Sequence, residues 1–504
     1  MGRWSWPAAL GSLTGCIFID DDEHAAFLAT FDARDTDTAT ATDTHTGADT
    51  DAQVVSISEL AQRIPADGDV TEYGRTLALG DVDGDGTGEV LAGYIQDDRP
   101  CLSVIDEERF GSSEDPAGSG LGDAWFIGGF GTAQDGVPIA VLPGSETPIL
   151  TGDPLYRRSA AATGGVWLLA REYSGQNYDV GVVAGEAGGD EAGASIAVGP
   201  SDEVAVGAPG AVCGTVYVGN WPFEAGASGA LAGDFSTSVS TAGLHQLVVD
   251  CAGDSDQVAW EDFGRSLVMD DFTGSGLLGL AVGAPTSQSA ANGGGVVYFI
   301  PAYELLTAES DGIVYLSEDD SAFVIHGLEP GGDFGASLTS ADANGDGGAD
   351  LVVGEPNGVG EGAYGAGSAY FYFELEQLAA DTYADEAGTV VRGDVEEQHV
   401  GSALAGLHAG GSPGGEQVAV GAVGYGGGRG GVLITPTGDT LQSGTFTTLV
   451  GGLLLGGAGA NDGLGGFLAS SDVDMDSLPD LAMGTPSAGA SGEGAVWLLR
   501  GSAH

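Results

Sequence analysis

Short apolar stretches recur along the chain from residue 53 onward, and glycine-rich or acidic turns separate them. Many of these stretches alternate apolar and polar side chains, and others are brief apolar runs such as LAVG at 280–283 and LVVG at 351–354. Helical periodicity is nearly absent. Stretches of this length, bounded by turn residues, are typical of β-strands. The pattern therefore predicts an all-β protein built from many short strands.

The strands are grouped in a repeat. The clearest copies begin at residues 73, 263, 334 and 464, two degenerate copies begin at 192 and 400, and a weak copy begins near 121. The mean spacing is about 65 residues, which is a period typical of arrays and propellers. Each unit predicts four strands, so each unit forms one blade.

A single blade leaves its apolar faces exposed, so neighbouring blades have to stack and close into a ring. Seven units predict a seven-bladed β-propeller over residues 53–504, with four strands per blade. The last unit ends after its third strand. We expect residues 53–61 (QVVSISELA) to supply the fourth and so to close the ring.

The N-terminus carries a different signal. Leu13-Thr14-Gly15-Cys16 resembles the bacterial lipobox, so we interpret residues 1–15 as a lipoprotein signal peptide and Cys16 as the lipidated residue. Ile17 after the cysteine resembles outer-membrane sorting, with the protein either surface-exposed or facing the periplasm. The alternative is a chance LxGC string. Residues 16–52 are rich in Asp and Thr, which predicts a solvated, disordered tether.

Charge excludes several classes of partner. The chain has 13 basic and 74 acidic residues, a net charge of −61, so it repels nucleic acid and anionic lipid surfaces. A lipid anchor is then the predicted contact with the membrane. Export favours a disulfide, which we assign to Cys213 and Cys251, whereas Cys101 opens an apolar strand and is expected to be a buried thiol.

Three units contain an acidic loop in the same register, between their first and second strands. Side-chain oxygens at the first, third, fifth and ninth positions can converge on one cation, and the seventh position can add a carbonyl oxygen. Such an all-oxygen set suits Ca²⁺, and the alternative is a solvated acidic turn. The predicted ligands of about three calcium sites are Asp81, Asp83, Asp85, Thr87 and Glu89; Asp342, Asn344, Asp346, Gly348 and Asp350; and Asp472, Asp474, Asp476, Leu478 and Asp480.

The unit resembles the FG-GAP repeat of the integrin α-subunit β-propeller over residues 53–504. The resemblance is carried by Phe-Gly pairs such as 263–264 and 334–335, and by Gly-Ala-Pro turns at 207–209 and 283–285. It implies seven blades and partner binding at the face formed by the loops between strands four and one, and two and three. The fourth unit keeps only Asp271 of the acidic set, so we expect no tight calcium site there.

Other candidate sites are weaker. The segment 143–164 is the longest predicted loop on that face, and Tyr156, Arg157 and Arg158 within it could anchor an anionic partner, unless they are simply solvated. The GxSxG string at 410–414 lies between two strands, not in the strand-turn-helix setting of a nucleophile, so we expect no catalytic residue.

These observations favour a non-enzymatic, calcium-stabilised and lipid-anchored propeller that binds a protein or a glycan at the cell envelope, as in adhesion. Two alternatives stay open. One is a hydrolase or a subunit of a hydrolase assembly, since FG-GAP propellers accompany some phospholipases. The other is a purely structural envelope protein. A fold alone does not decide among these functions.

Overall fold

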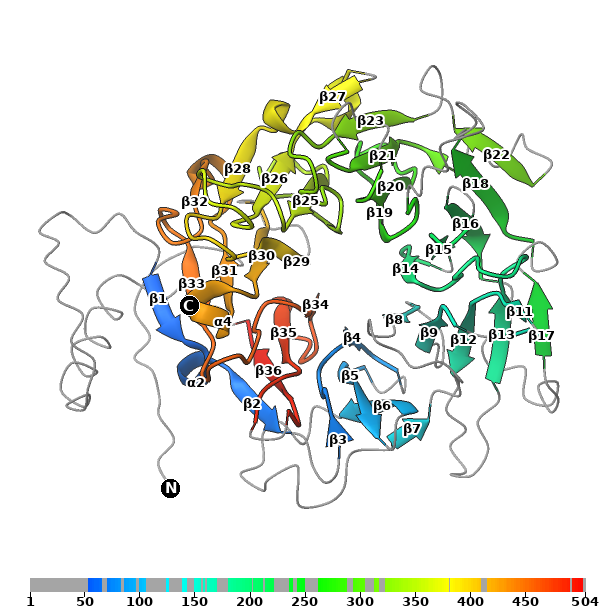
Figure 1. Cartoon of the computed structure of the whole chain (residues 1–504), viewed down its shortest axis with the longest axis horizontal. Coiled ribbons are helices and arrows are strands. Elements are labelled where there is room, and N and C mark those ends of the chain that lie inside the picture. Colours follow the sequence, from blue (N-terminus) through cyan, green and yellow to red (C-terminus); the bar gives the residue numbers. More distant parts are fainter. Residues whose placement is uncertain are drawn as a thin grey trace, which may run out of the picture.

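Seven small β-sheets are arranged in a ring around one axis in the computed structural model (Figure 1). The predicted seven-bladed β-propeller is therefore confirmed. The structure describes residues 53–65, 70–82, 86–96, 99–105, 124–126, 138–142, 149–155, 157–158, 161–169, 180–201, 203–211, 214–221, 235–238, 243–249, 262–287, 293–303, 312–316, 322–379, 381–408, 415–489 and 492–501.

In each blade the first strand lies nearest the axis and later strands lie further out (Figure 1). Blade one contains β4 (Leu77–Gly80), β5 (Glu89–Gln96), β6 (Arg99–Ile105) and β7 (Ala124–Phe126), with β3 (Val70–Thr71) paired to the end of β5. Blade two contains β8 (Ile139–Val141), β9 (Ile149–Asp153), β12 (Gly165–Leu169) and β13 (Val180–Ala184). Blade three contains β14 (Ser195–Val198), β15 (Glu203–Ala208), β16 (Thr215–Asn220) and β18 (His245–Val249).

The later blades repeat this order. Blade four contains β19 (Ser266–Asp270), β20 (Gly279–Ala284), β21 (Val296–Ile300) and β23 (Phe323–His326). Blade five contains β24 (Ser337–Ala341), β25 (Asp350–Glu355), β26 (Ser368–Tyr372) and β28 (Thr389–Arg392). Blade six contains β29 (Val400–Leu407), β30 (Gln417–Ala422), β31 (Gly431–Ile434) and β33 (Leu453–Gly456). Blade seven contains β34 (Leu468–Ser471), β35 (Asp480–Thr485), β36 (Ala495–Leu499) and β2 (Gln62–Pro65).

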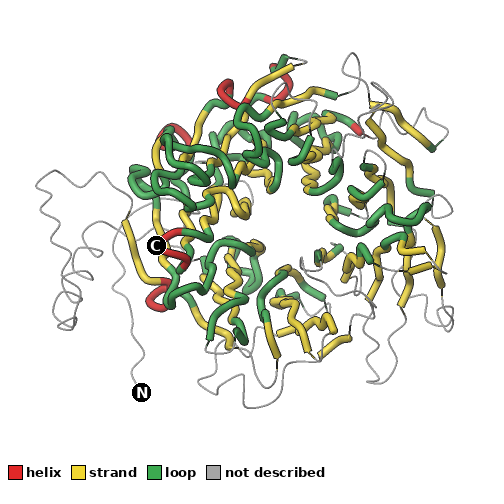
Figure 2. The backbone as a smooth tube through the Cα atoms, viewed as in Figure 1, coloured by secondary structure: helices red, strands yellow, loops and turns green. Residues whose placement is uncertain are grey.

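Strands and loops make up nearly all of the described chain (Figure 2). The described helices are single turns: α2 (Ile57–Leu60), α4 (Tyr425–Gly428), η3 (Leu375–Gln377), η4 (Ala384–Glu386) and η5 (Gly438–Thr440). None of them has the length and apolar character needed to cross a membrane.

Apolar side chains fill the seven spaces between neighbouring blades. Each of seven buried clusters draws its residues from two adjacent sheets, including the pair formed by blades seven and one. The second strands β20, β25, β30 and β35 are buried along their whole length, because both of their faces contact a neighbouring blade. Such two-sided burial explains why the middle of each of these strands is a continuous apolar run.

The two glycine motifs of the repeat contact each other across the blade boundary. In blade five, Phe334 is fully buried and Gly335 after it has a φ of +87°, in the left-handed region that glycine tolerates best. A Cβ atom on Gly283, in the Gly-Ala-Pro turn of blade four, would lie 2.2 Å from the carbonyl oxygen of Gly335. Nearby, the hydroxyl of Ser266 donates to the same oxygen at 2.6 Å. The FG and GAP signatures are therefore the two sides of one interblade contact.

Among the described residues, five blades carry an additional outer strand that belongs to the following blade. The segment between the third and fourth strands of one blade crosses over and pairs in parallel with the fourth strand of the preceding blade. The sequence predicted four strands per blade and missed these. They are β17 (Phe235–Ser238) on blade two, β22 (Ile313–Leu316) on three, β27 (Asp381–Tyr383) on four, β32 (Gly444–Thr445) on five and β1 (Gln53–Ser56) on six.

The N-terminal segment closes the ring with different residues from those predicted. The fourth strand of blade seven is β2, which pairs antiparallel with β36 from Gln62↔Leu498 to Pro65↔Ala495. The predicted segment 53–61 instead supplies β1, which pairs in parallel with β33 of blade six, and the short helix α2. In blades three to six the segment before the fourth strand pairs with the preceding blade. In blade seven the N-terminal segment does the same, with β1 on blade six followed by β2 as the fourth strand.

Blade two starts later than the sequence predicted. The segment near 121 contains β7, the fourth strand of blade one, and the first strand of blade two is β8. The segment 143–164 is likewise not a single loop, because it contains the buried strand β9. Apolar and polar residues alternate only weakly in this region, so the sequence did not indicate where the repeat begins.

Candidate metal centres

The acidic segments all connect the first and second strands of their blades, so they lie on one face of the ring. Each is a nine-residue loop whose second side chain is buried, as for Val82, Ala343 and Val473. The backbone is left-handed at the sixth position, at Gly86, Gly347 and Ser477, where φ is +94°, +92° and +70°. This turn folds the loop back over its own first residue. Glycine, which tolerates this conformation best, occupies the position in blades one and five.

Blade seven brings three carboxylates together. Oxygen atoms of Asp472, Asp474 and Asp476 all lie within 4.8 Å of one another. The backbone N–H groups of Asp476 and Ser477 donate to Asp472 at 3.1 and 2.9 Å, which fixes the first carboxylate under the turn. Within the described part of the chain, Oδ1 of Asp474 is buried and has no hydrogen-bond partner. A cation held among the three carboxylates would satisfy this buried oxygen.

The ninth residue of this loop, Asp480, is fully buried. Its two oxygens accept the backbone N–H groups of Val473 at 2.9 Å and of Gly501 at 2.8 Å. This carboxylate therefore ties the loop to the end of β36 and still has lone pairs for a cation.

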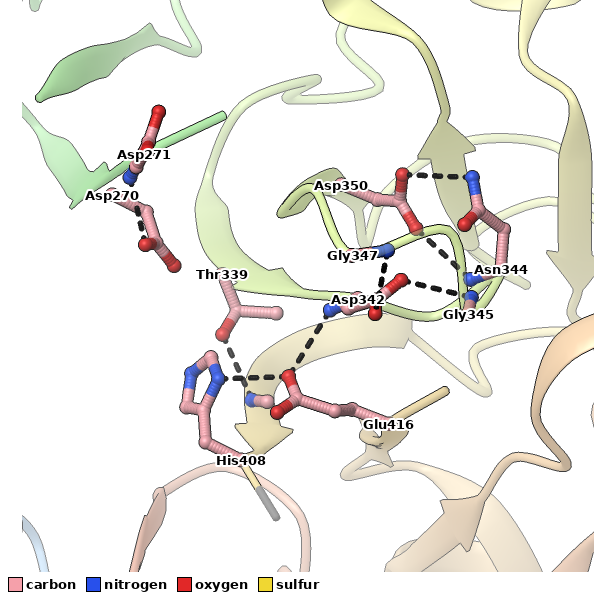
Figure 3. Close-up of polar contacts among 11 residues, drawn as sticks. Asp270, Asp271, Thr339, Asp342, Asn344, Gly345, Gly347, Asp350, His408 and Glu416 are labelled. Atoms are coloured by element: carbon pink, nitrogen blue, oxygen red, sulfur yellow. Dashed lines mark hydrogen bonds and ion pairs between the residues drawn. The ribbon is translucent and has the colours of Figure 1, made fainter. Parts of the chain in front are cut away.

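Blade five holds its loop in the same way (Figure 3). The backbone N–H groups of Gly345 and Gly347 donate to Asp342 at 2.8 and 3.0 Å. The amide nitrogen of the Asn344 side chain lies 2.9 Å from Asp346 Oδ2 and 3.3 Å from Asp350 Oδ1. Hydrogen bonds therefore bring together Asn344, Asp346 and Asp350, three of the four predicted side-chain ligands of blade five. Here an amide donor satisfies carboxylates that a cation would otherwise bind.

Blade one is described only in part. Glu89 is buried and accepts the backbone N–H of Val82 at 2.7 Å, and Asp81 accepts that of Gly86 at 3.1 Å. These bonds match those of Asp480 and Asp472 in blade seven. Asp83 and Asp85 lie outside the described residues.

Burial makes ionisation of these loops unfavourable when no cation is bound. Burial raises the pKa of Asp350 to about 8, and repulsion by Asp346 and Asp342 adds to the shift. Burial likewise raises the pKa of Asp480 to about 6, with repulsion from Asp474 and Asp476. A bound dication would remove this penalty, because it favours the charged form of every carboxylate around it.

Sequence reasoning missed three contacts made by the loops. Arg500 places Nη1 at 3.5 Å from Asp474 Oδ2, so it offsets part of the charge in blade seven. Glu416 of blade six accepts the backbone N–H of Asp342 at 3.1 Å and also contacts His408 at 3.0 Å (Figure 3). The N–H of Gly88 donates to the carbonyl of Val473 at 2.8 Å, which joins the loops of blades one and seven. The contact between Gly88 and Val473 could have been expected only from the closure of the ring, which makes blades one and seven neighbours.

Most residues of the remaining predicted sites lie outside the described residues. Arg157 and Arg158 form β10, which pairs with β11 (Ala161–Ala162), and Tyr156 lies outside the described residues. Cys16, Cys213 and Cys251 also lie outside them. Cys101 is buried in β6, as predicted.

The fold and these loops define the class of protein, a β-propeller with acidic loops on one face. A family model for the FG-GAP repeat matches residues 334–372 and 464–499, which are the first three strands of blades five and seven. The chain therefore carries FG-GAP repeats, and its ring is consistent with an integrin α-like propeller. This propeller is typically a non-catalytic fold used for binding. No curated protein sequence matches the chain.

Proposed function

We propose that the chain is a calcium-binding propeller that presents a binding surface for a protein or a glycan at the cell envelope. The observation that supports calcium best is the cluster formed by Asp472, Asp474 and Asp476 with its buried, unsatisfied oxygen. All its donors are oxygens, which suits Ca²⁺ and not a metal that prefers His or Cys. The corresponding residues of blades five and one would hold the second and third ions.

Calcium in this proposal stabilises loops and does not take part in a reaction. Extracellular calcium modules bind at roughly 10⁻⁴–10⁻³ M. At about tenfold excess over Kd, each site would contribute about 1.4 kcal/mol by mass action. That amount orders a loop and holds its carboxylates in place.

The binding role and the location rest on other observations. The FG-GAP propeller is a fold of adhesion-type modules, and the face opposite the acidic loops carries the connections between strands two and three and between successive blades. The lipid anchor rests on Leu13–Cys16 alone. We propose an outer-membrane lipoprotein, with the Asp/Thr-rich segment 16–52 as its tether.

Native mass spectrometry of the chain, with and without chelator, tests the metal sites. We expect about three calcium ions, with one ion lost in each of Asp83→Ala, Asp346→Ala and Asp474→Ala. Thr273→Ala in blade four is the matched control and should leave the count unchanged. Absence of bound calcium at millimolar concentration would overturn the proposal. Glycan and protein arrays probed in calcium and in chelator would then test the binding role.

A further inference from the structure

Glu355 is a buried acid at a position where the repeat usually has alanine. It replaces the alanine of the Gly-Ala-Pro turn in blade five, whereas Ala208 and Ala284 occupy that position in blades three and four. The residue is 1% exposed, and its Oε2 accepts a hydrogen bond from the Tyr370 hydroxyl at 2.6 Å. Among the described residues, Oε1 has no hydrogen-bond partner. Because blades three and four form the turn with alanine, the turn itself does not require a carboxyl group.

Two glycines make room for this carboxyl group. A Cβ atom on Gly332 would lie 2.5 Å from Oε1, and one on Gly358 would lie 2.8 Å from Oε2. Gly332 belongs to the connection between blades four and five, and Gly358 to the loop between strands two and three of blade five. The N–H of Asn357 donates to the Gly332 carbonyl at 3.0 Å, so the two loops are also joined directly. The carboxyl group is therefore enclosed between loop 328–333 and loop 356–367.

The groups that face Glu355 do not neutralise its charge. Loop 328–333 contributes two further acids, Glu329 and Asp333, and β26 contributes the hydroxyls of Tyr370 and Tyr372. Arg392 on β28 acts on Tyr370. Burial raises the pKa of Glu355 to about 7. Hydrogen bonding by the Tyr370 hydroxyl and by the backbone of Glu329 lowers it, and the negative charges of Glu329 and Asp333 raise it.

We propose that Glu355 is a proton-operated lock that holds loops 328–333 and 356–367 together when it is neutral and loosens them when it ionises. Both loops lie on the face opposite the acidic loops, and they carry the exposed side chains of Leu328 and Tyr364, which are 37% and 69% exposed. The positions of these two side chains on the surface therefore change with pH. This consequence for ligand binding rests on the proposed binding function, whereas the lock itself does not.

The direction of the effect follows from the raised pKa. The carboxyl group holds its proton more tightly in the closed loops than in opened loops, where its ordinary value is 4.5. Closure is therefore most stable below about pH 4.5, weakens as the pH rises to about 7, and changes little above that value. In that window the opening equilibrium shifts by up to about tenfold per pH unit.

Hydrogen exchange of the full chain at fixed calcium, measured by mass spectrometry between pH 5 and 8, tests the lock. We expect the protection factors of 328–333 and 356–367, corrected for intrinsic exchange at each pH, to fall by up to about tenfold per unit between pH 5 and 7. Glu355→Gln, a neutral group of the same shape, should keep them constant. Glu361→Gln, exposed on the same loop, is the matched control and should behave as wild type. Equal pH dependence in wild type and Glu355→Gln would overturn the lock.

A second variant and a second region keep the result specific. Glu329→Gln removes one repelling neighbour, so the pH dependence should become smaller without disappearing. Calcium-dependent protection of 342–350 reports on the metal proposal in the same samples. If protection of 342–350 does not depend on calcium but protection of 328–333 and 356–367 still depends on pH, the metal sites alone are overturned. If protection of 342–350 depends on calcium but the two loops show no pH dependence, the lock alone is overturned.

Discussion

Blades four and five build the same loop from different chemistry. In blade four, Asp271 accepts the backbone N–H groups of Ser275 and Gly276 at 3.0 and 2.7 Å. Asp342 in blade five accepts the same bond from the sixth residue, Gly347, and takes its second bond from the fourth residue, Gly345. Between the third and fifth positions, however, blade four has a hydroxyl–hydroxyl hydrogen bond, from Thr273 to Ser275 at 2.8 Å, and its ninth residue is glycine. Figure 3 shows Asp271 beside the blade-five loop.

The comparison separates two roles within one motif. The first aspartate is needed for the turn, because it accepts backbone N–H groups in blades one, four, five and seven alike. The carboxylate and amide side chains at the third, fifth and ninth positions are not needed for it, since blade four folds without them. Their presence in three blades therefore requires another explanation, and a bound cation supplies one.

Removal of calcium should have the largest effect. Three sites at about 1.4 kcal/mol each predict that chelation lowers the free energy of unfolding by about 4 kcal/mol. Thermal or urea denaturation with chelator, followed by restoration of calcium, measures this. An unchanged midpoint would show that the acids of blades five and seven are as independent of metal as the hydroxyls of blade four.

Loss of the first aspartate of blade four should come next. Asp271→Ala removes the acceptor of two exposed backbone N–H groups, which water can then bind, so it should cost about 1 kcal/mol whether or not calcium is present. Asp346→Ala should instead abolish the calcium-dependent part of the stability contributed by blade five. Denaturation of both variants in calcium and in chelator distinguishes the two roles, and equal calcium dependence in both would contradict the separation.

A graft should convert one loop toward the other. Thr273→Asp combined with Ser275→Asp gives blade four the first, third and fifth ligands, so native mass spectrometry should detect one additional calcium ion. In chelator the new carboxylates repel Asp271, and stability should fall by about 1 kcal/mol. The pair Thr273→Val and Ser275→Ala, which supplies no ligand oxygen at either position, is the control. We leave Gly279 unchanged, because a Cβ there would lie 2.9 Å from Phe272.

The smallest effect concerns the turn in blade seven. Ser477 adopts a left-handed φ of +70°, where its counterparts Gly86, Gly276 and Gly347 are glycines. Ser477→Gly should relieve this conformation and stabilise the chain by about 0.5–1 kcal/mol. Gly347→Ala imposes the opposite change and should destabilise it by a similar amount. Denaturation in calcium measures both, and a destabilised Ser477→Gly would indicate that the serine side chain contributes a contact of its own.

The repeat could be predicted from sequence because its signals are local. Phe334-Gly335 and Gly283-Ala284-Pro285 report one interblade contact that recurs around the ring, and the acidic loops are contiguous in the chain. The ligand geometry of blades five and seven was accessible for the same reason. Glu416 and Arg500 were not, because they approach the loops from another blade or from the end of another strand.

The errors have a common physical origin. The added outer strands, such as β22 and β27, are short, and they are stabilised by pairing with a neighbouring blade and not by their own pattern. Closure by β2 in place of 53–61 reflects the same long-range pairing. In blade two the alternation is weak, so the register shifted and β9 was read as part of a loop.

The N-terminal segment also determines how the ring resists force. Any pull transmitted through the chain from before residue 53 reaches β1 first, and β1 is paired along Gln53–Ser56 with blade six. Only after those four residues separate does the load reach β2 and blade seven. Under such a load β1 should therefore detach from blade six before β2 detaches from blade seven and the ring opens.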